Sequence, residues 1–323
     1  MVFKEPKVAI IIPCKTVDTY TKKCVERCSK LSYTNYEIIV LPDEADELSG
    51  EKVKVIPTGA VKPLKKRFIG SVASDGEICA FIDSDAYPDP GWLKNAVPHF
   101  VNPEVAAVAG PSLTDEKSSV MEKASSLILA SSLGAGAASI RYRPHERLVY
   151  ITETPTCNLV IRKSVLGAVE KLAPDVWPGE EIVFCGLITH KLGMKILYDP
   201  RVLVYHRRRP LYRPHLKQIW SYGLVKGHLS KSYPKFVRLQ FFMPALLIVG
   251  VVGGFPLALV NPVIRLLYVL SILAYVLLSL SSGISAGLKE RNVKMVLHVF
   301  LGTMATHLCY GLSFIRGFFS KKV

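Results

Sequence analysis

Ile78-Cys-Ala-Phe-Ile-Asp-Ser-Asp85 joins a short apolar run to two carboxylates that are separated by one serine. The apolar part is typical of a strand that is buried on both faces of a sheet. Alternate side chains of an extended chain point the same way, so Asp83 and Asp85 could share one hard divalent cation where the strand ends. The alternative interpretation is an acidic turn, because residues 83–90 are also rich in turn-forming types. The segments around this run favour the cation site.

Those segments alternate between strand-like and helix-like patterns. Val8–Ile12 is a continuous apolar run closed by Pro13, and Tyr36–Leu41 is a second run that ends at Pro42-Asp43. Further strands or extended segments are expected over 52–56, 77–82, 105–110, 152–160 and within 195–205, and helices over 19–31, 62–74, 91–100, 118–138, 164–172 and 180–192. This alternation predicts an α/β layered sheet whose ligands bind at the carboxyl ends of the strands.

The last third of the chain is much more apolar than the rest. Runs of about the 20 residues needed to cross a bilayer cover 239–260, 263–284 and 295–315. We expect about three membrane segments rather than core helices, because residues 239–283 carry a single charge, Arg265. The predicted organisation is therefore a soluble domain over 1–210, a basic juxtamembrane connector over 211–238 and a transmembrane domain over 239–323.

The net charge of +15 is concentrated beside the apolar segments. Between Lys195 and Arg238 there are eleven Lys or Arg and one acid, Asp199. Such a segment agrees with the positive-inside rule and attracts anionic lipid headgroups, and no nucleic-acid-binding motif accompanies it. We see no signal peptide before the first strand, and the seven cysteines include no CxxC pair. These features predict an integral protein of the cell membrane whose N-terminal domain is cytoplasmic and which has no nucleic-acid partner.

The number of spans stays open at this point. Three spans would place Arg316, Lys321 and Lys322 on the outer side, against the positive-inside tendency. One segment could therefore be re-entrant, and the glycine-rich run Gly250–Pro256 is the candidate for it.

Taken together, the motifs resemble those of the family 2 glycosyltransferases. These are inverting enzymes of the GT-A fold, a Rossmann-like mixed sheet, and they move a sugar from a nucleotide diphosphate to an acceptor. The resemblance runs through most of residues 7–210 and is carried by Val8–Pro13, Asp43, Lys66-Arg67 with the following Gly70–Gly76, Phe81–Asp85 and Thr156–Arg162. It implies a nucleotide-sugar donor, a UDP- or GDP-sugar, bound by Pro13, Asp43, Lys66, Arg67 and Asp83, with Asp43 at the nucleotide base.

The resemblance also implies a metal site and an acceptor side. Asp85 would hold Mg²⁺ or Mn²⁺, with Asp83 on the metal or on the ribose of the donor, together with His206 at the end of the last predicted strand. A solvated histidine in a basic run is the alternative interpretation of His206. Asn158 and Arg207 are expected on the acceptor side.

The catalytic base differs from the common pattern of the family. Where Gly-Glu-Asp is common, this chain has Gly179-Glu-Glu181, so Glu181 is the candidate general base and Glu180 its orienter or alternate. Two adjacent acids are also ordinary residues at a helix N-terminus, where they complement the helix dipole.

The acceptor is predicted from the architecture. A basic connector next to the membrane suggests an acceptor in the bilayer that carries phosphate, either a polyprenyl phosphate or a polyprenyl-diphosphate-linked glycan, although diacylglycerol stays possible. Gln218–Gly223 stands where processive synthases carry Gln-x-x-Arg-Trp, which argues against a polymer-extruding enzyme. Two alternatives remain: a polyprenyl-phosphate hexose synthase, and a membrane-anchored scaffold that binds a nucleotide sugar without turning it over.

Overall fold

The computed structural model of the chain describes residues 5–115, 117–143, 146–172 and 179–320. The chain folds into two compact units. The first unit contains Met1–Asp115 and Arg143–Arg207, and the second contains Glu116–Tyr142 and Arg208–Val323. The break after Arg207 lies close to the boundary expected at residue 210. Residues 117–142, which lie within the range predicted for the soluble domain, group with the C-terminal helices in the second unit.

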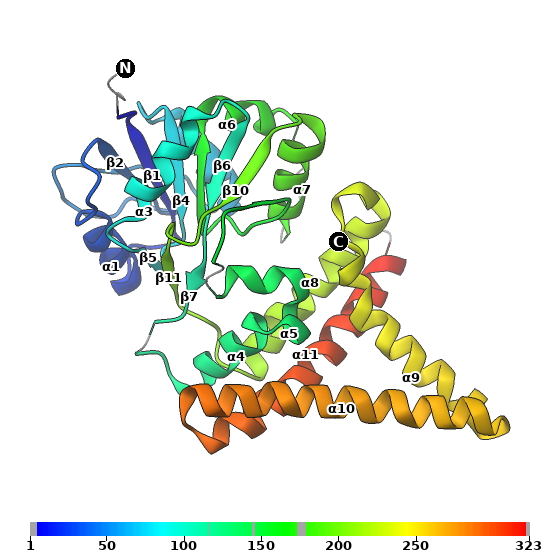
Figure 1. The fold of residues 1–323 in the computed structure, drawn as a ribbon. Coiled ribbons are helices and arrows are strands. Elements are labelled where there is room, and N and C mark those ends of the chain that lie inside the picture. Colours follow the sequence, from blue (N-terminus) through cyan, green and yellow to red (C-terminus); the bar gives the residue numbers. More distant parts are fainter. Residues whose placement is uncertain (1–4, 116, 144–145, 173–178, 321–323) are drawn as a thin grey trace. The chain divides into compact units, whose positions relative to one another are not determined.

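The first unit is built on a mixed sheet with the strand order β3-β2-β1-β4-β9-β6-β10-β8 (Figure 1). Its strands are β1 (Val8–Pro13), β2 (Tyr36–Leu41), β3 (Val53–Val55), β4 (Ile78–Ile82), β6 (Val105–Ala109), β8 (Val149–Ile151), β9 (Asn158–Arg162) and β10 (Lys195–Tyr198). Strands β1 to β4 run parallel, whereas β9 is antiparallel to both β4 and β6. Every residue of β1, β2 and β4 is buried, which explains why these strands are apolar except for Glu37 in β2.

Helices cover both faces of this sheet. They are α1 (Thr19–Cys28), α2 (Pro63–Val72), α3 (Trp92–Ala96), α6 (Lys163–Glu170) and α7 (Glu180–Gly186). On one face Ile10 and Ile38 share a core with Cys24 of α1 and Trp92 of α3. On the other face α2 lies so close that a Cβ at Gly70 would be 2.8 Å from side-chain atoms of Ile11 and Leu41. Because successive strand residues alternate in direction, β1 contributes to both layers.

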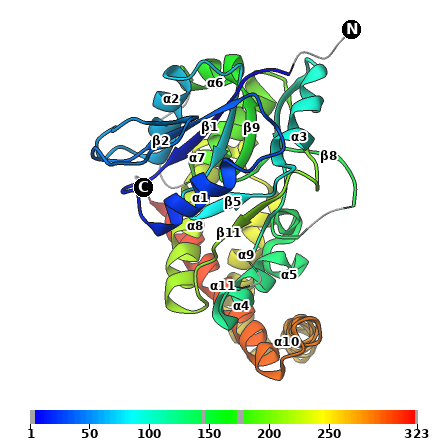
Figure 2. The same ribbon diagram turned by 90° about the vertical axis from the view of Figure 1, so that its left-hand side faces the viewer.

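A smaller sheet lies at the carboxyl ends of the parallel strands. It contains β5 (Ala86–Pro88), β11 (Val204–His206) and β7 (Ser112–Leu113), with β11 in the middle (Figure 1). Figure 2 shows β5 and β11 from another side. The predicted strand within 195–205 is therefore two strands, β10 and β11, which belong to different sheets.

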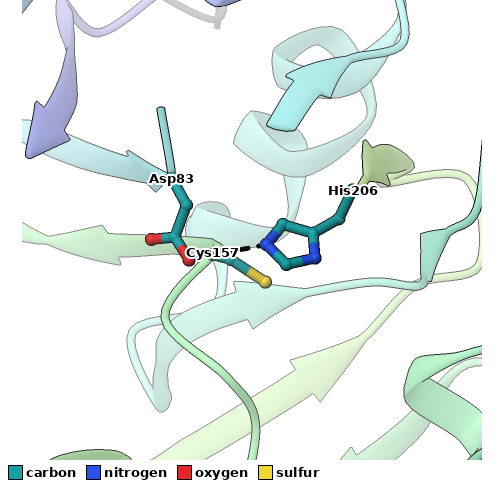
Figure 3. A group of neighbouring side chains, drawn as sticks. All are labelled: Asp83, Cys157 and His206. Atoms are coloured by element: carbon teal, nitrogen blue, oxygen red, sulfur yellow. Dashed lines mark ion pairs between the residues drawn. The ribbon is translucent and has the colours of Figure 1, made fainter. Parts of the chain in front are cut away.

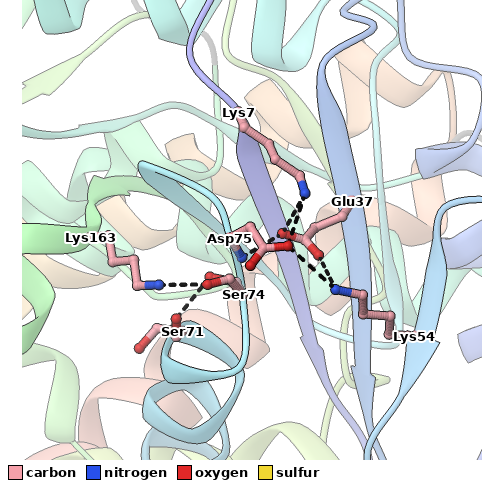
Figure 4. A network of polar contacts seen from close by, with 7 residues as sticks. All are labelled: Lys7, Glu37, Lys54, Ser71, Ser74, Asp75 and Lys163. Atoms are coloured by element: carbon pink, nitrogen blue, oxygen red, sulfur yellow. Dashed lines mark hydrogen bonds and ion pairs between the residues drawn. The ribbon is translucent and has the colours of Figure 1, made fainter.

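A cluster of charges joins the opposite ends of the strands (Figure 4). The Glu37 carboxylate of β2 accepts hydrogen bonds from the Lys54 ammonium at 2.9 Å and the Asp75 amide at 2.9 Å, and Lys7 lies 3.4 Å away. Burial alone would raise the pKa of Glu37, but these partners together hold it below its usual value. The Lys163 ammonium donates to the Ser74 carbonyl at 2.6 Å, which links α6 to the end of α2.

The second unit is helical. Its α-helices are α4 (Val120–Ala130), α5 (Ser132–Ala135), α8 (Arg213–Ser232), α9 (Met243–Val260), α10 (Pro262–Glu290) and α11 (Val293–Phe319), with short 3₁₀ turns η2 (Gly136–Arg141), η4 (Pro234–Phe236) and η5 (Leu239–Phe242). Among the described residues, three helical segments are long and apolar enough to cross a membrane: Leu239–Val260, Pro262–Glu290 and Val293–Phe319. Only 11% and 6% of the apolar windows of the first two are buried within the chain, as expected for surfaces that face lipid.

Helix bounds depart from the sequence-based expectations at a few places. The predicted helix over 91–100 is α3 followed by a 3₁₀ turn, η1 (Val97–Val101), with Pro98 near its start. The predicted helix over 118–138 breaks at Ser131, whose ψ of 144° is extended. Gly250–Pro256 is helical throughout, as part of α9.

Candidate active site

Strand register brings distant segments together at the carboxyl end of β4. Ile82, the last residue of β4, pairs with Asn158, the first residue of the antiparallel β9. Asp83 therefore follows β4 at the point where Cys157 precedes β9. In the smaller sheet His206 pairs with Ala86, and the Arg207 amide donates to the Asp85 carbonyl at 3.3 Å. Strands β4, β5, β9 and β11 thus deliver side chains to one place.

The predicted metal residues are neighbours there. The His206 Nε2 atom lies 3.2 Å from Asp85 Oδ1 and 3.8 Å from Asp83 Oδ2. The side chains are 16% exposed for His206, 24% for Asp85 and 34% for Asp83. The structure therefore brings Asp83, Asp85 and His206 together at a partly open surface, and their metal role stays a prediction.

Cys157 belongs to the same group, although sequence reasoning did not select it. One ligand atom each of Asp83, Cys157 and His206 lies within 4.8 Å of the other two (Figure 3). The thiol lies 3.5 Å from the Ser112 hydroxyl, and Cys157 is 5% exposed. The signal for this residue is the antiparallel pairing of β4 with β9, which the sequence alone does not reveal.

Two consecutive basic residues of α2 hold the carboxylates of the site. The buried Lys66 ammonium donates to the carbonyls of Cys14 at 2.7 Å and Leu41 at 3.0 Å, and it contacts Asp43 Oδ1 at 2.5 Å. It therefore caps the ends of β1 and β2 and fixes Asp43, which is 26% exposed. Pro13 is the last residue of β1 and pairs with Leu41.

Arg67, the next residue of α2, holds the carboxylate that follows β4. Its Nη2 donates to Asp83 Oδ1 at 2.7 Å, and its Nη1 lies 3.6 Å from Glu180 Oε1. Because Arg67 engages one oxygen of Asp83, the other oxygen is the one that faces His206. The donor-binding roles of Pro13, Asp43, Lys66, Arg67 and Asp83 stay predictions, but the two basic residues clearly orient acidic ones.

The two candidate catalytic carboxyls differ in environment. Both lie in the first turn of α7, after Gly179, which has a left-handed φ of 100°. Glu180 is 4% exposed, whereas Glu181 is half-buried. Burial, with the charge of Glu181 adding to it, raises the pKa of Glu180 to about 8 despite Arg67. At pH 7 Glu180 is therefore mostly protonated, and a protonated carboxyl cannot accept a proton from an acceptor.

The two residues predicted on the acceptor side lie in different surroundings. Asn158 is fully buried: its carbonyl oxygen accepts from Trp92 Nε1 at 2.8 Å, and its amide donates to the carbonyls of Pro111 at 3.0 Å and Val202 at 2.8 Å. The amide therefore supports the strands around it, and its acceptor-side role stays a prediction. Arg207 is exposed, lies over the Tyr20 ring at 4.8 Å, and stays a prediction.

Comparisons with known proteins agree with this geometry. The family described as Glycosyl transferase family 2 matches residues 9–166. A pre-mycofactocin glycosyltransferase of Mycobacterium tuberculosis is 29% identical over 172 residues, which are 53% of this chain and 36% of the relative. The chain thus spans about a third of that relative's length.

A second relative covers more of both chains. The dolichyl N-acetyl-alpha-D-glucosaminyl phosphate 3-beta-D-2,3-diacetamido-2,3-dideoxy-beta-D-glucuronosyltransferase of Methanococcus voltae is 23% identical over 244 residues, 70% of this chain and 74% of the relative. Among solved structures, the mannosyltransferase PcManGT of Pyrobaculum calidifontis, in complex with GDP-Man and Mn²⁺, has a TM-score of 0.55 and 15% identity. The match covers 99% of this chain and 89% of that one. The predicted family and fold are confirmed: this chain contains a glycosyl transferase family 2 domain on a GT-A-like fold.

Proposed function

We propose that this protein is an inverting glycosyltransferase that moves a sugar from a nucleotide-diphosphate sugar to a lipid-linked acceptor in the membrane. The observation that carries the proposal is the cluster of Asp83, Asp85 and His206 at the end of β4, in a chain that also has three helices apolar enough to cross a membrane. The name of the Methanococcus voltae relative describes a dolichyl-linked sugar phosphate as acceptor, which supports this acceptor class. A polyprenyl phosphate or a polyprenyl-diphosphate-linked glycan would fit.

The residues at the end of β4 fit a divalent cation. Two carboxylate oxygens and an imidazole nitrogen converge there, and Arg67 fixes the direction of the Asp83 carboxylate. A bound cation would neutralise charge on the diphosphate leaving group. Mg²⁺ and Mn²⁺ both accept oxygen ligands, and Mn²⁺ tolerates the imidazole better.

The chain's own groups account for the remaining needs of the reaction. Asp43, whose carboxylate is held by Lys66, is the residue proposed to accept hydrogen bonds from the nucleotide base. Glu181 is the proposed general base, since it is partly exposed and its neighbour Glu180 keeps a proton at pH 7. Removal of the acceptor's proton by Glu181 on the face opposite the leaving group gives inversion.

The test is release of nucleoside diphosphate by the detergent-purified full chain. A panel of UDP- and GDP-sugars is supplied with and without Mn²⁺, together with either a bare polyprenyl phosphate or a lipid-linked saccharide. We expect metal-dependent release from one donor, reduced at least about 100-fold by Asp85→Ala or Glu181→Gln. The preferred acceptor separates a hexose synthase from an enzyme that extends a glycan.

Glu26→Gln is the matched control, because it makes the same chemical change at an exposed carboxylate whose partner is Lys30. It should leave the rate unchanged. Binding of a nucleotide sugar without release of nucleoside diphosphate, with every acceptor tried, would contradict catalysis and favour the scaffold. Full activity of Glu181→Gln would contradict its role as the base.

A further inference from the structure

The position of Cys157 beside the proposed metal residues is set by the backbone and not by a flexible side chain. The pairing of Ile82 with Asn158 fixes both Asp83 and Cys157 at adjacent strand ends. His206 is fixed in turn by the pairing of β11 with β5. Ligand atoms of Asp83, Cys157 and His206 are all within 4.8 Å of one another (Figure 3).

A sulfur atom changes which ions such a site prefers. An imidazole, a carboxylate and a thiolate are the ligand types of zinc sites, whereas Mg²⁺ selects oxygen ligands. Zn²⁺ also binds a given set of nitrogen, oxygen and sulfur ligands more tightly than Mn²⁺ does. The presence of Cys157 therefore bears on ion selectivity.

We propose that Cys157 is a further ligand of this site, and that with Asp83 and His206 it binds a thiophilic divalent ion, Zn²⁺, in preference to Mg²⁺. The inference rests on the metal centre of the proposed function but not on sugar transfer itself. Binding of the ion replaces the thiol proton, which is released to solvent, and a thiolate–metal bond forms.

The geometry needs little adjustment to close around an ion. Ligand atoms of a tetrahedral zinc site are about 3.4 to 3.8 Å apart, as follows from bond lengths of about 2.0 to 2.3 Å. The present spacing, at most 4.8 Å, thus requires a movement of roughly 1 Å by the side chains. Arg67 holds one oxygen of Asp83, and the Ser112 hydroxyl lies 3.5 Å from the Cys157 sulfur, so two of the ligands have supporting neighbours.

A plain packing role for Cys157 is the competing explanation, because free cysteine is often buried as a small apolar residue. Packing predicts that serine in its place changes stability alone. Ligation predicts a change in metal binding, and this difference makes the two explanations separable.

Co²⁺ is the probe, since a cobalt–thiolate bond gives a charge-transfer absorption in the near ultraviolet that oxygen and nitrogen ligands do not give. We expect this band when Co²⁺ alone is added to the detergent-purified full chain, and its displacement by Zn²⁺ but not by equimolar Mg²⁺. Cys157→Ser should abolish the band and weaken Zn²⁺ binding at least about 10-fold. Cys309→Ser, which removes a thiol in the second unit, should keep the absorption band and the affinity for Zn²⁺.

Absence of the band in the wild type, or its persistence in Cys157→Ser, overturns the proposal. If Cys157→Ser does not fold, His206→Ala decides instead, because a cobalt–sulfur band that arises at this site must weaken when the neighbouring His206 is removed. Nucleoside diphosphate release is measured on the same preparations. Release with Mn²⁺ but no cobalt–sulfur band refutes the ligand role of Cys157 and leaves the proposed function intact. The band without release supports the ligand role of Cys157 and contradicts the proposed function.

Discussion

At the scale of single residues, Arg67 organises the charge of the site. Its guanidinium is 3% exposed and lies between the Asp83 carboxylate, 34% exposed, and Glu180, 4% exposed. The single positive charge of Arg67 is balanced by one ionised carboxylate. Asp83, the more exposed of the two acids, makes the closer contact and supplies that charge. Glu180, which has lost its water and has Glu181 beside it, keeps its proton instead.

Glu180→Gln should therefore stabilise the protein, and more so as the pH rises. The folded-state pKa of about 8 lies above the ordinary glutamate value of 4.5. The unfolded chain thus releases this proton at lower pH than the folded chain, so wild-type stability falls between about pH 4.5 and 8. Glutamine resembles the protonated carboxyl and removes that loss, about 4 kcal/mol at pH 7.5. Thermal denaturation in detergent at pH 5 and 7.5 measures the effect.

Glu44→Gln is the control for this prediction, because it makes the same change at an exposed carboxylate. Glu180→Gln should denature at nearly the wild-type temperature at pH 5 and at a higher one at pH 7.5. A shift of the same size at both pH values would show that the effect is unrelated to the proton on Glu180.

Sequence reasoning could select Asp83, Asp85 and His206, because spacing and position at strand ends are local properties. It could not find Cys157, whose role depends on the register between β4 and β9. Nor could it foresee the enclosure of the Asn158 amide by Trp92 and two carbonyls, which is a tertiary property.

At the scale of elements, the difference between local and tertiary properties also explains which helix bounds the sequence predicts correctly and which it does not. The small residues of 118–138 predict one helix, but the Ser131 side chain donates to the Ile128 carbonyl at 2.8 Å and accepts from the Gly134 amide at 2.8 Å. Serine competes with the backbone in this way and ends α4. The parallel strands, in contrast, follow directly from their apolar sequences.

Helix α8 shows how the expected connector is held. It packs along α11 through glycines: a Cβ at Gly223 would lie 2.0 Å from the Ser313 hydroxyl, and one at Gly227 only 2.1 Å from the Phe314 carbonyl. Gly317 of α11 approaches the Leu224 carbonyl equally closely. The pattern of small residues four apart allows two helix backbones to come close together. Its partner helix cannot be read from the sequence of α8.

Gly227→Ala should therefore destabilise the second unit, by about 1 to 3 kcal/mol, because a backbone carbonyl must move to admit the methyl group. Gly250→Ala is the matched control. In the part of the chain that the structure describes, its Cβ would meet no atom within 4 Å outside its own helical turns. Alanine at position 250 only increases helix propensity. Gly227→Ala should therefore lower the denaturation temperature, and Gly250→Ala should raise it slightly. Equal shifts would contradict close α8–α11 packing.

At the scale of the whole molecule, the positive charges indicate which side of the membrane each end of the three apolar helices faces. Eleven Lys or Arg lie between Lys195 and Arg238, before the first span, and the turn between α9 and α10 at Asn261 has none. The turn between α10 and α11 is again basic, with Lys289, Arg291 and Lys294. Alternating spans put both basic segments on one side, which outweighs the few charges after α11.

We therefore expect the first unit and the α10–α11 turn on the cytoplasmic side, and Asn261 outside. Single cysteines introduced at Lys22, which is exposed on α1, and at Asn261 test this in intact cells with a membrane-impermeant thiol reagent. Asn261→Cys should react at once, and Lys22→Cys only after the cells are permeabilised. The unsubstituted chain gives the background of its own cysteines, six of which are buried. Labelling of Lys22→Cys in intact cells would contradict this orientation. It would also contradict the expectation that the nucleotide-sugar donor binds on the cytoplasmic side.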